Sequence, residues 1–315
     1  MAWPCRGHAA ELESYDHSFG RQAVQRDAPS DVPHQKACVE VVALDARGPA
    51  LAPRAQLVDD RTEFFSGARK AIAVAATARE GLPENDSGLL EIAAGTGVLT
   101  RAMVGALPET SAIVATDLNK PMIEHARAIG TRRTVEWRQA DAMKLPFNDG
   151  TFDAVVCQFG VMFFPDKPGA FSEARCVLKR GGMLIFNVWD RIEENDFADV
   201  VTAALAGVFP HDPPRFMART PHGYHDKNAI RRDLVKGGLA APAEIVTLPA
   251  RSRALSHRSP AIAYCQGTPL RNEIEARDGS RLAEATELAA EAIGARFGHG
   301  FVDGKIQAHI IRVET

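Results

Sequence analysis

A carboxylate stands four residues before a pair of glycines in the segment LLEIAAGTGVLT, residues 89–100. The apolar residues leading to Glu91 predict a strand, and the apolar residues after Gly97 recur at helical spacing. A strand, a glycine-containing turn and a helix place backbone N–H groups at one edge of a sheet, where doubly wound folds bind ligands. Gly95 and Gly97 let the main chain approach such a ligand closely. The alternative is a structural turn with no ligand.

The turn does not fit the dinucleotide-binding pattern G-x-G-x-x-G, because Thr100 stands where the third glycine would be. A pyrophosphate gains nothing from a carboxylate at Glu91, whereas a cationic ligand does. Asp117 ends the next predicted strand, twenty residues after Gly97, and a carboxylate there suits the hydroxyls of a ribose. That position serves several nucleotide ligands equally, and Asp117 could also simply cap the following helix.

The loop Glu91-Ile92-Ala93-Ala94-Gly95-Thr96-Gly97 resembles the cofactor loop of class I S-adenosylmethionine-dependent methyltransferases. The resemblance runs from Leu89 to Trp189 and is to the small-molecule branch typified by ubiquinone and menaquinone biosynthesis C-methyltransferases. It includes LPFNDGTFDAVVCQFG, which leads into the fourth strand, and EARCVLKRGGMLIF, which leads into the fifth. The resemblance implies S-adenosylmethionine as the cofactor, a sulfonium with an amino-acid tail.

The resemblance also implies where this cofactor would bind. It puts Asp141 opposite the adenine amino group and the turn at Gln158 beside the methyl donor. Met122 would lie against the adenine, although an apolar residue there is equally compatible with the core. The predicted cofactor-binding residues are Glu91, Ala93, Gly95, Thr96, Gly97, Asp117, Leu118, Met122, Asp141, Ala142, Gln158, Phe159 and Gly160.

The sequence departs from the family pattern at several positions. Ala93 stands where the first glycine of the loop is often found, and the fourth strand ends in Gln158 rather than Asp. The Asn/Asp-Pro-Pro-Tyr signature is replaced by QFGVMFF, which argues against methylation of nucleic acids or glutamine. Carbon, oxygen and small-amine acceptors remain open.

Methyl transfer from a sulfonium needs alignment more than acid–base chemistry, so the sequence predicts no firm catalytic residue. The weak candidates are His222, Tyr224 and His225 in the segment RTPHGYHD. They could equally cap the next helix and pack a loop. No metal site is expected, because the histidines and the five cysteines lack ligand spacing and no CxxC pair occurs.

Strands and helices must alternate to position these residues. One predicted strand precedes the loop, and a second ends at Asp117. Three more cover VEWRQAD, FDAVVCQFG and MLIFNVW. The helix KPGAFSEARCVLKR is expected to end at Gly181 and Gly182. Near-continuous apolar strands indicate a parallel sheet covered on both faces. The predicted fold class is α/β: a doubly wound, mostly parallel seven-stranded sheet with helices on both faces, a Rossmann-like methyltransferase fold with an antiparallel last strand.

The composition predicts an irregular or disordered extension over 1–55, and the resemblance implies a methyltransferase domain over 56–315, in which 192–300 is expected to contain a substrate cap. The net charge of −3 and pI of about 6.4 argue against a nucleic-acid partner. No signal peptide or membrane-spanning run is evident, and scattered cysteines suit a reducing cytoplasm.

The sequence thus predicts methyl transfer from S-adenosylmethionine to a small-molecule acceptor. Two alternatives stay open at this point: a scaffold that binds S-adenosylmethionine without turnover, and an NAD(P)-dependent oxidoreductase. The sequence names neither the acceptor nor the oligomeric state.

Overall fold

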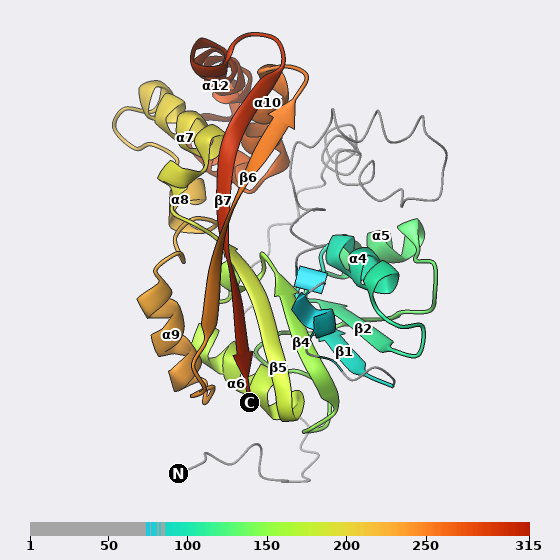
Figure 1. Cartoon of the computed structure of the whole chain (residues 1–315). Helices are drawn as coiled ribbons and strands as arrows, with labels where there is room; N and C mark the ends of the chain where they lie inside the picture. Colours follow the sequence, from blue (N-terminus) through green and yellow to red (C-terminus); the bar gives the residue numbers. More distant parts are fainter. Residues whose placement is uncertain (1–73, 76, 81, 83–85) are drawn as a thin grey trace, which may run out of the picture.

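The computed structural model describes residues 74–75, 77–80, 82 and 86–315, so the expectation for 1–55 lies outside the described residues. Seven strands form one sheet in the order β3-β2-β1-β4-β5-β7-β6 (Figure 1). They are β1 (Gly88–Glu91), β2 (Ala112–Asp117), β3 (Glu136–Gln139), β4 (Phe152–Gln158), β5 (Leu178–Trp189), β6 (Glu244–Ala254) and β7 (Val302–Glu314). The first five strands run parallel, and β7 pairs antiparallel with both β5 and β6. The predicted fold class is confirmed.

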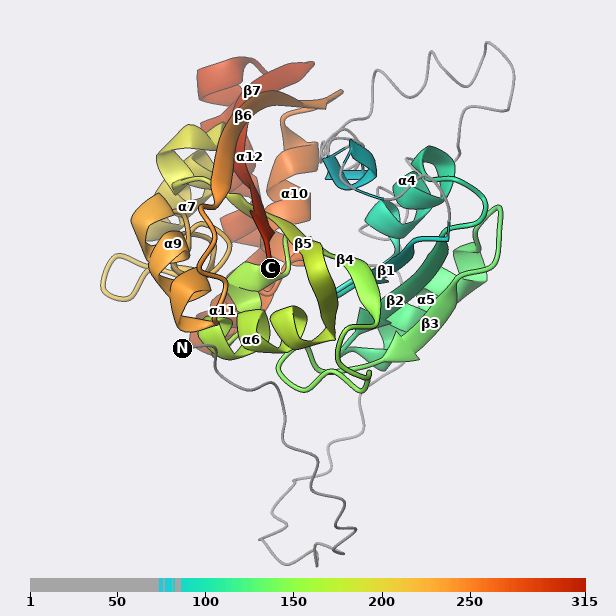
Figure 2. The same cartoon turned by 60° about the horizontal axis from the view of Figure 1, so that its bottom comes forward.

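Helices cover both faces of the sheet because its apolar residues alternate between the faces. Leu89 packs on one face with α4 (Val98–Ala106), and Leu90 packs on the other with α6 (Lys167–Val177) and α9 (Lys227–Lys236). Helix α5 (Lys120–Ile129) packs against Trp137 of β3. Figures 1 and 2 show α6 and α9 on one side of the sheet and α4 on the other.

The predicted end of α6 at the glycine pair is wrong. The helix ends at Val177, and the chain enters β5 directly at the buried Leu178, which pairs with Phe152 of β4. The next pair is Ala154 with Met183, so β5 bulges between them, and Gly181 adopts the positive φ of 75° that this bulge requires. The glycines therefore shape a strand bulge instead of capping the helix.

Strands β6 and β7 extend beyond the sheet as a two-stranded arm. β7 pairs with β6 from Val302 to Arg312, but with β5 only from Ala308 onward. Residues 302–307 of β7, paired with 249–254 of β6, therefore project past the carboxyl end of β5. This is the same edge of the sheet at which β1 to β4 end.

A helical lobe packs against this arm (Figure 1). It consists of α7 (Asp196–Val208), α8 (Phe216–Arg219), α10 (Arg258–Gly267), α11 (Leu270–Asp278) and α12 (Leu282–Phe297), which share one apolar cluster with Val302 and Ala254 of the arm. The lobe uses two separate parts of the predicted 192–300 cap, whereas α9 and β6 of that range belong to the sheet layers. Its proposed role as a substrate cap stays a prediction. No helix among the described residues is long and apolar enough to cross a bilayer.

Candidate cofactor and acceptor site

The loop between β1 and α4 is tied to the end of β2 by Asp117. One carboxylate oxygen accepts a hydrogen bond from the Gly95 N–H at 2.8 Å, and the other accepts from the Asn119 N–H at 2.8 Å. Gly95 has a φ of 56°, and a Cβ added there would have no atom of the described residues within 4 Å. The loop therefore presents its backbone to open space at Gly95, beside a carboxylate.

Glu91 lies beneath this loop instead of on its surface. Its side chain is buried, and one carboxyl oxygen accepts a hydrogen bond from the Thr100 hydroxyl at 2.5 Å. Burial raises the pKa of Glu91 from 4.5 to about 8. Thr100 is also fully buried, so Glu91 presents no exposed oxygen to a ligand at the loop.

The chain segments after β2 and β3 lie side by side. The Gln139 side-chain amide donates to the Leu118 carbonyl at 2.9 Å, which joins the two segments. Asp141 accepts from the Met143 N–H at 2.9 Å through one oxygen. Leu118 is 66% exposed and Met122 is 40% exposed, so both leave apolar surface beside the loop. Ala142, next to Asp141, is partly buried against the core below the sheet.

The turn after β4 meets the β1 loop at Gly160. A Cβ at Gly160 would lie 2.5 Å from the Ala93 Cβ, so only glycine allows this approach. Ala93 and Phe159 both adopt positive φ, 54° and 52°. The structure thus brings the predicted residues from the ends of β1, β2, β3 and β4 to one edge of the sheet. Thr96 and Gly97 lie in the same loop, where the Thr96 carbonyl accepts from Arg101.

Comparison with known proteins agrees with this geometry. A family model described as a methyltransferase domain matches residues 90–186. Residues 90–186 are therefore similar to a methyltransferase domain. The Escherichia coli ubiquinone/menaquinone biosynthesis C-methyltransferase UbiE is 40% identical over 101 residues, which cover 31% of this chain and 40% of that protein. The chain therefore matches less than half the length of these curated relatives.

Two solved structures share the fold over about four fifths of this chain. A putative methyltransferase from Bacillus halodurans is 20% identical with a TM-score of 0.50, covering 79% of this chain and 99% of its own. The YcgJ protein from Bacillus subtilis is 18% identical with a TM-score of 0.51, covering 78% of this chain and 98% of its own. At these identities the two structures show the shared fold, and the family match over 90–186 and the similarity to UbiE confirm the resemblance to class I methyltransferases, which use S-adenosylmethionine.

The three weak catalytic candidates make different contacts. The buried His222 hydrogen-bonds through Nδ1 to the Asp190 carbonyl at 2.8 Å, and its ring lies 6.0 Å from that of Trp189. The Tyr224 hydroxyl donates to Asp233 of α9 at 3.0 Å, and burial raises its pKa further from neutrality. His225 is partly buried next to them. His222 thus contacts the end of β5, and the Tyr224 ring lies 4.8 Å from the Lys167 ammonium at the start of α6.

Sequence reasoning missed two residues at the end of β5. The Phe159 ring stacks on Trp189, with centroids 4.1 Å apart and planes 11° apart. The Phe159 N–H donates to Oδ1 of Asn187 at 2.7 Å, and the Nδ2 of that fully buried amide has no hydrogen-bond partner among the described residues. A single amide inside the apolar run MLIFNVW was the signal, because a buried polar side chain needs a partner.

Proposed function

We propose that this protein transfers a methyl group from S-adenosylmethionine to a small-molecule acceptor at a carbon, an oxygen or a small amine. The observation that carries the proposal is the convergence of Asp117, the open Gly95 backbone and the Gly160 turn at one sheet edge within a methyltransferase domain. This is the edge at which open α/β sheets bind their ligands.

The residues fit the cofactor's chemical groups. Each Asp117 oxygen uses one lone pair on a backbone N–H, so each keeps a second lone pair for a ribose hydroxyl. Leu118 and Met122 offer apolar surface for the adenine, and the second oxygen of Asp141 can accept from its amino group. Burial raises the pKa of Glu91 to about 8, so its carboxyl is mostly protonated at neutral pH, and a sulfonium and an ammonium group bound at the loop would favour its ionised form.

Bound S-adenosylmethionine supplies an activated methyl group and a neutral leaving group, so the protein's contribution is to position the acceptor in line and exclude water. In-line positioning can supply about 7–11 kcal/mol when the geometry is ideal. The stacked Phe159 and Trp189 give a flat apolar wall beside Gln158. Further along, the Phe163 and Phe216 rings lie 6.5 Å apart and join the domain to the lobe. Aromatic walls of this kind suit a small organic acceptor.

The name of the relative UbiE does not establish which acceptor this chain would methylate. UbiE is a ubiquinone/menaquinone biosynthesis C-methyltransferase. The family model nevertheless stops at residue 186, before Trp189 and the helical lobe. Carbon methylation is therefore one of the three acceptor classes to test, and the lobe is where the acceptor would be selected.

Calorimetry with S-adenosylhomocysteine and NADH, followed by methyl-transfer assays, tests the proposal. We expect S-adenosylhomocysteine to bind and NADH not to bind. Binding of NADH alone would overturn the proposal in favour of an oxidoreductase. Binding of S-adenosylhomocysteine without transfer to any quinol, phenol, sterol-like compound or amine would favour a non-catalytic scaffold.

A further inference from the structure

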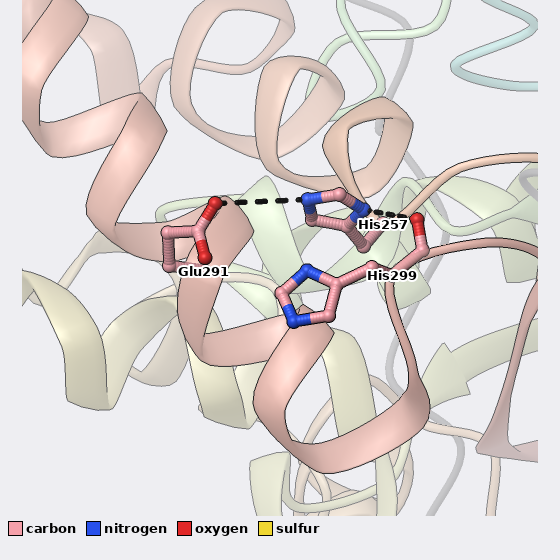
Figure 3. Close-up of side chains that lie close together, drawn as sticks. All are labelled: His257, Glu291 and His299. Atoms are coloured by element: carbon pink, nitrogen blue, oxygen red, sulfur yellow. Dashed lines mark hydrogen bonds and ion pairs between the residues drawn. The ribbon is translucent and has the colours of Figure 1, made fainter.

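Two histidines and a glutamate converge in the helical lobe, away from the proposed methyl-transfer site. His257 immediately precedes α10, Glu291 lies on α12, and His299 lies in the segment that follows α12 (Figure 3). One ligand atom from each lies within 4.8 Å of the other two. His257 and Glu291 are 34 positions apart in the sequence, and Glu291 and His299 are eight apart, so no short sequence motif indicates the cluster.

The hydrogen bonding of His257 leaves one ring nitrogen directed at this cluster. Its Nδ1 lies 2.6 Å from the His299 carbonyl, which can only accept, so Nδ1 carries the proton. When the imidazole is neutral, the Nε2 atom presents a lone pair, 3.9 Å from the Glu291 carboxylate. His257 is 8% exposed, and this Nε2 has no hydrogen-bond partner among the described residues. A backbone carbonyl that fixes the tautomer in this way is typical of metal-binding histidines.

Gly294 on α12 provides the space for the second histidine. A Cβ added at Gly294 would lie 2.6 Å from Nδ1 of His299 and 3.2 Å from Cδ2 of His257. The two imidazole rings consequently sit edge to face, with centroids 4.9 Å apart and an interplanar angle of 82°. Figure 3 shows the two rings and the Glu291 carboxylate close together, with His257 joined to Glu291 on one side and to the His299 carbonyl on the other.

We propose that His257, Glu291 and His299 bind one divalent transition-metal ion, with Zn²⁺ as the best fit to two imidazoles and a carboxylate. Tetrahedral coordination at ordinary zinc distances separates ligand atoms by about 3.4 Å. The 3.9 Å between His257 and Glu291 is close to this value. Because Glu291 and His299 are exposed, their side chains can move the remaining distance, and a water can complete the coordination.

The site goes beyond methyl transfer and would act on the lobe. A bound ion would join the start of α10 to the end of α12, next to the entry into β7. Both helices contribute to the apolar cluster that holds the arm. Metal binding would therefore stabilise the lobe by mass action, because the unfolded chain does not assemble the three ligands.

Calorimetric titration of the metal-free full-length protein with ZnCl₂ tests the site. We expect one ion to bind, with the affinity reduced about tenfold or more in His299→Ala and in Glu291→Gln, and the same in His257→Ala. Glu287→Gln is the matched control, since Glu287 lies one turn earlier on α12 and pairs with Arg258 instead. Zn²⁺ should also raise the melting temperature of the wild type and of this control, but not of the ligand variants.

Glu291 and His299 are exposed, so replacing either of them tests metal binding without disturbing the fold. His299→Ala and Glu291→Gln change surface side chains, and far-UV circular dichroism would show that they fold. The proposal is overturned if the wild type binds no Zn²⁺, or if both variants bind it with wild-type affinity and stoichiometry. Gly294→Ala gives a further check, because its methyl group would displace His299 and should weaken binding.

Discussion

Asp117 combines a structural contact with a proposed ligand contact in a single side chain. Its carboxylate fixes the Gly95 and Asn119 N–H groups and keeps one lone pair on each oxygen for a ribose. We expect Asp117→Ala to weaken S-adenosylhomocysteine binding about 100-fold, from the loss of about 3 kcal/mol in hydrogen bonds. Asp117→Asn keeps one acceptor and should lose less. An unchanged affinity in the alanine variant, measured by calorimetry, would remove Asp117 from the site.

Glu91 makes the stability of the domain depend on pH. Burial raises its pKa from 4.5 in the unfolded chain to about 8 in the folded one, so between these values the folded state holds a proton that the unfolded state lacks. This contribution to stability is present below pH 4.5 and is lost as the pH rises to about 8. Glu91→Gln cannot ionise, so its stability relative to wild type should increase across this range and then level off.

Urea denaturation of both proteins at several pH values measures this difference. Thr100→Val is the control that keeps the ionisable group, since it removes only the hydroxyl that donates to Glu91. Parallel pH profiles for wild type and Glu91→Gln would contradict the assignment. A cationic ligand favours the ionised carboxylate, so cofactor affinity should rise with pH up to about 8 in wild type and stay flatter in Glu91→Gln.

The sequence predicted those site residues whose positions follow from the order of the strands along the chain. Glu91, Asp117 and Asp141 each follow a predicted strand, and the carboxyl ends of parallel strands share one edge. The burial of Glu91 and the open lone pair of His257 depend on segments that pack from elsewhere in the chain. No local pattern contains that information, which is why the cluster around His257 was not predicted.

At the scale of elements, the contact between the β1 loop and the turn after β4 is tight and specific. Ala93 adopts a left-handed φ of 54°, which costs an L-residue about 1 kcal/mol relative to glycine. Its Cβ faces Gly160, where an added Cβ would lie 2.5 Å away and also 2.7 Å from the Cys157 sulfur. We expect Gly160→Ala to destabilise the protein by about 1–3 kcal/mol and to weaken cofactor binding.

Ala93→Gly should act in the opposite direction. It relieves the positive φ and is expected to stabilise by up to about 1 kcal/mol. In the double variant, the methyl group added at position 160 no longer meets a Cβ at position 93, and only its clash with Cys157 remains, so Gly160→Ala should cost less than it does alone. A double-mutant cycle from urea denaturation measures this coupling, and strictly additive effects would show that the two turns do not touch.

Element ends were predicted less well than element types, and α6 shows the physical reason. Glycine after a helical pattern usually marks a helix end. Here, however, Leu178 gains a buried place opposite Phe152 of β4 by leaving the helix early. Tertiary pairing between β4 and β5 therefore outweighed the local signal, and the glycines were left to form the bulge.

At the scale of the whole molecule, the length of the arm formed by β6 and β7 leaves one edge of β7 without a neighbouring strand. β5 ends at Trp189, so β7 has no strand beside it from Val302 to Gln307 on the edge away from β6. The segment that follows β5 fills this place. Asp196 accepts from the Lys305 N–H at 2.5 Å, and Asn195 accepts from the Gln307 N–H at 3.1 Å. The exposed strand edge is thereby satisfied by side chains.

Sequence patterns indicated a helical insertion near the carboxyl edge but not its construction from two segments. Residues 192–219 precede β6, and residues 258–297 lie between β6 and β7. The two segments come together in the lobe because β6 pairs with β7 across a connection that contains three α-helices. Long-range pairing of this kind leaves no local periodicity. The sequence predicted a seven-stranded sheet with an antiparallel last strand, but not how far β6 and β7 run past the other strands.

Asp196 therefore joins the lobe to the arm, and replacing it should lower the unfolding free energy of the protein. It lies at the start of α7, holds the Lys305 N–H and also pairs with Arg296 of α12 at 2.9 Å. Asp196→Ala leaves a backbone donor without its partner, so we expect a loss of about 1–3 kcal/mol in unfolding free energy and faster hydrogen exchange over residues 302–307.

The size of this loss separates an edge-capping role from an ordinary ion pair. Asp196→Asn retains an acceptor for Lys305 while losing the charge, so it should keep most of the stability. Glu284→Ala is the control, because it removes a surface pair with Arg281 that is expected to contribute only about 0–1 kcal/mol. If Asp196→Ala costs no more than Glu284→Ala, or exchange over 302–307 does not change, then the edge of β7 is held by its pairing with β6 alone and the lobe is attached to the arm by its apolar cluster.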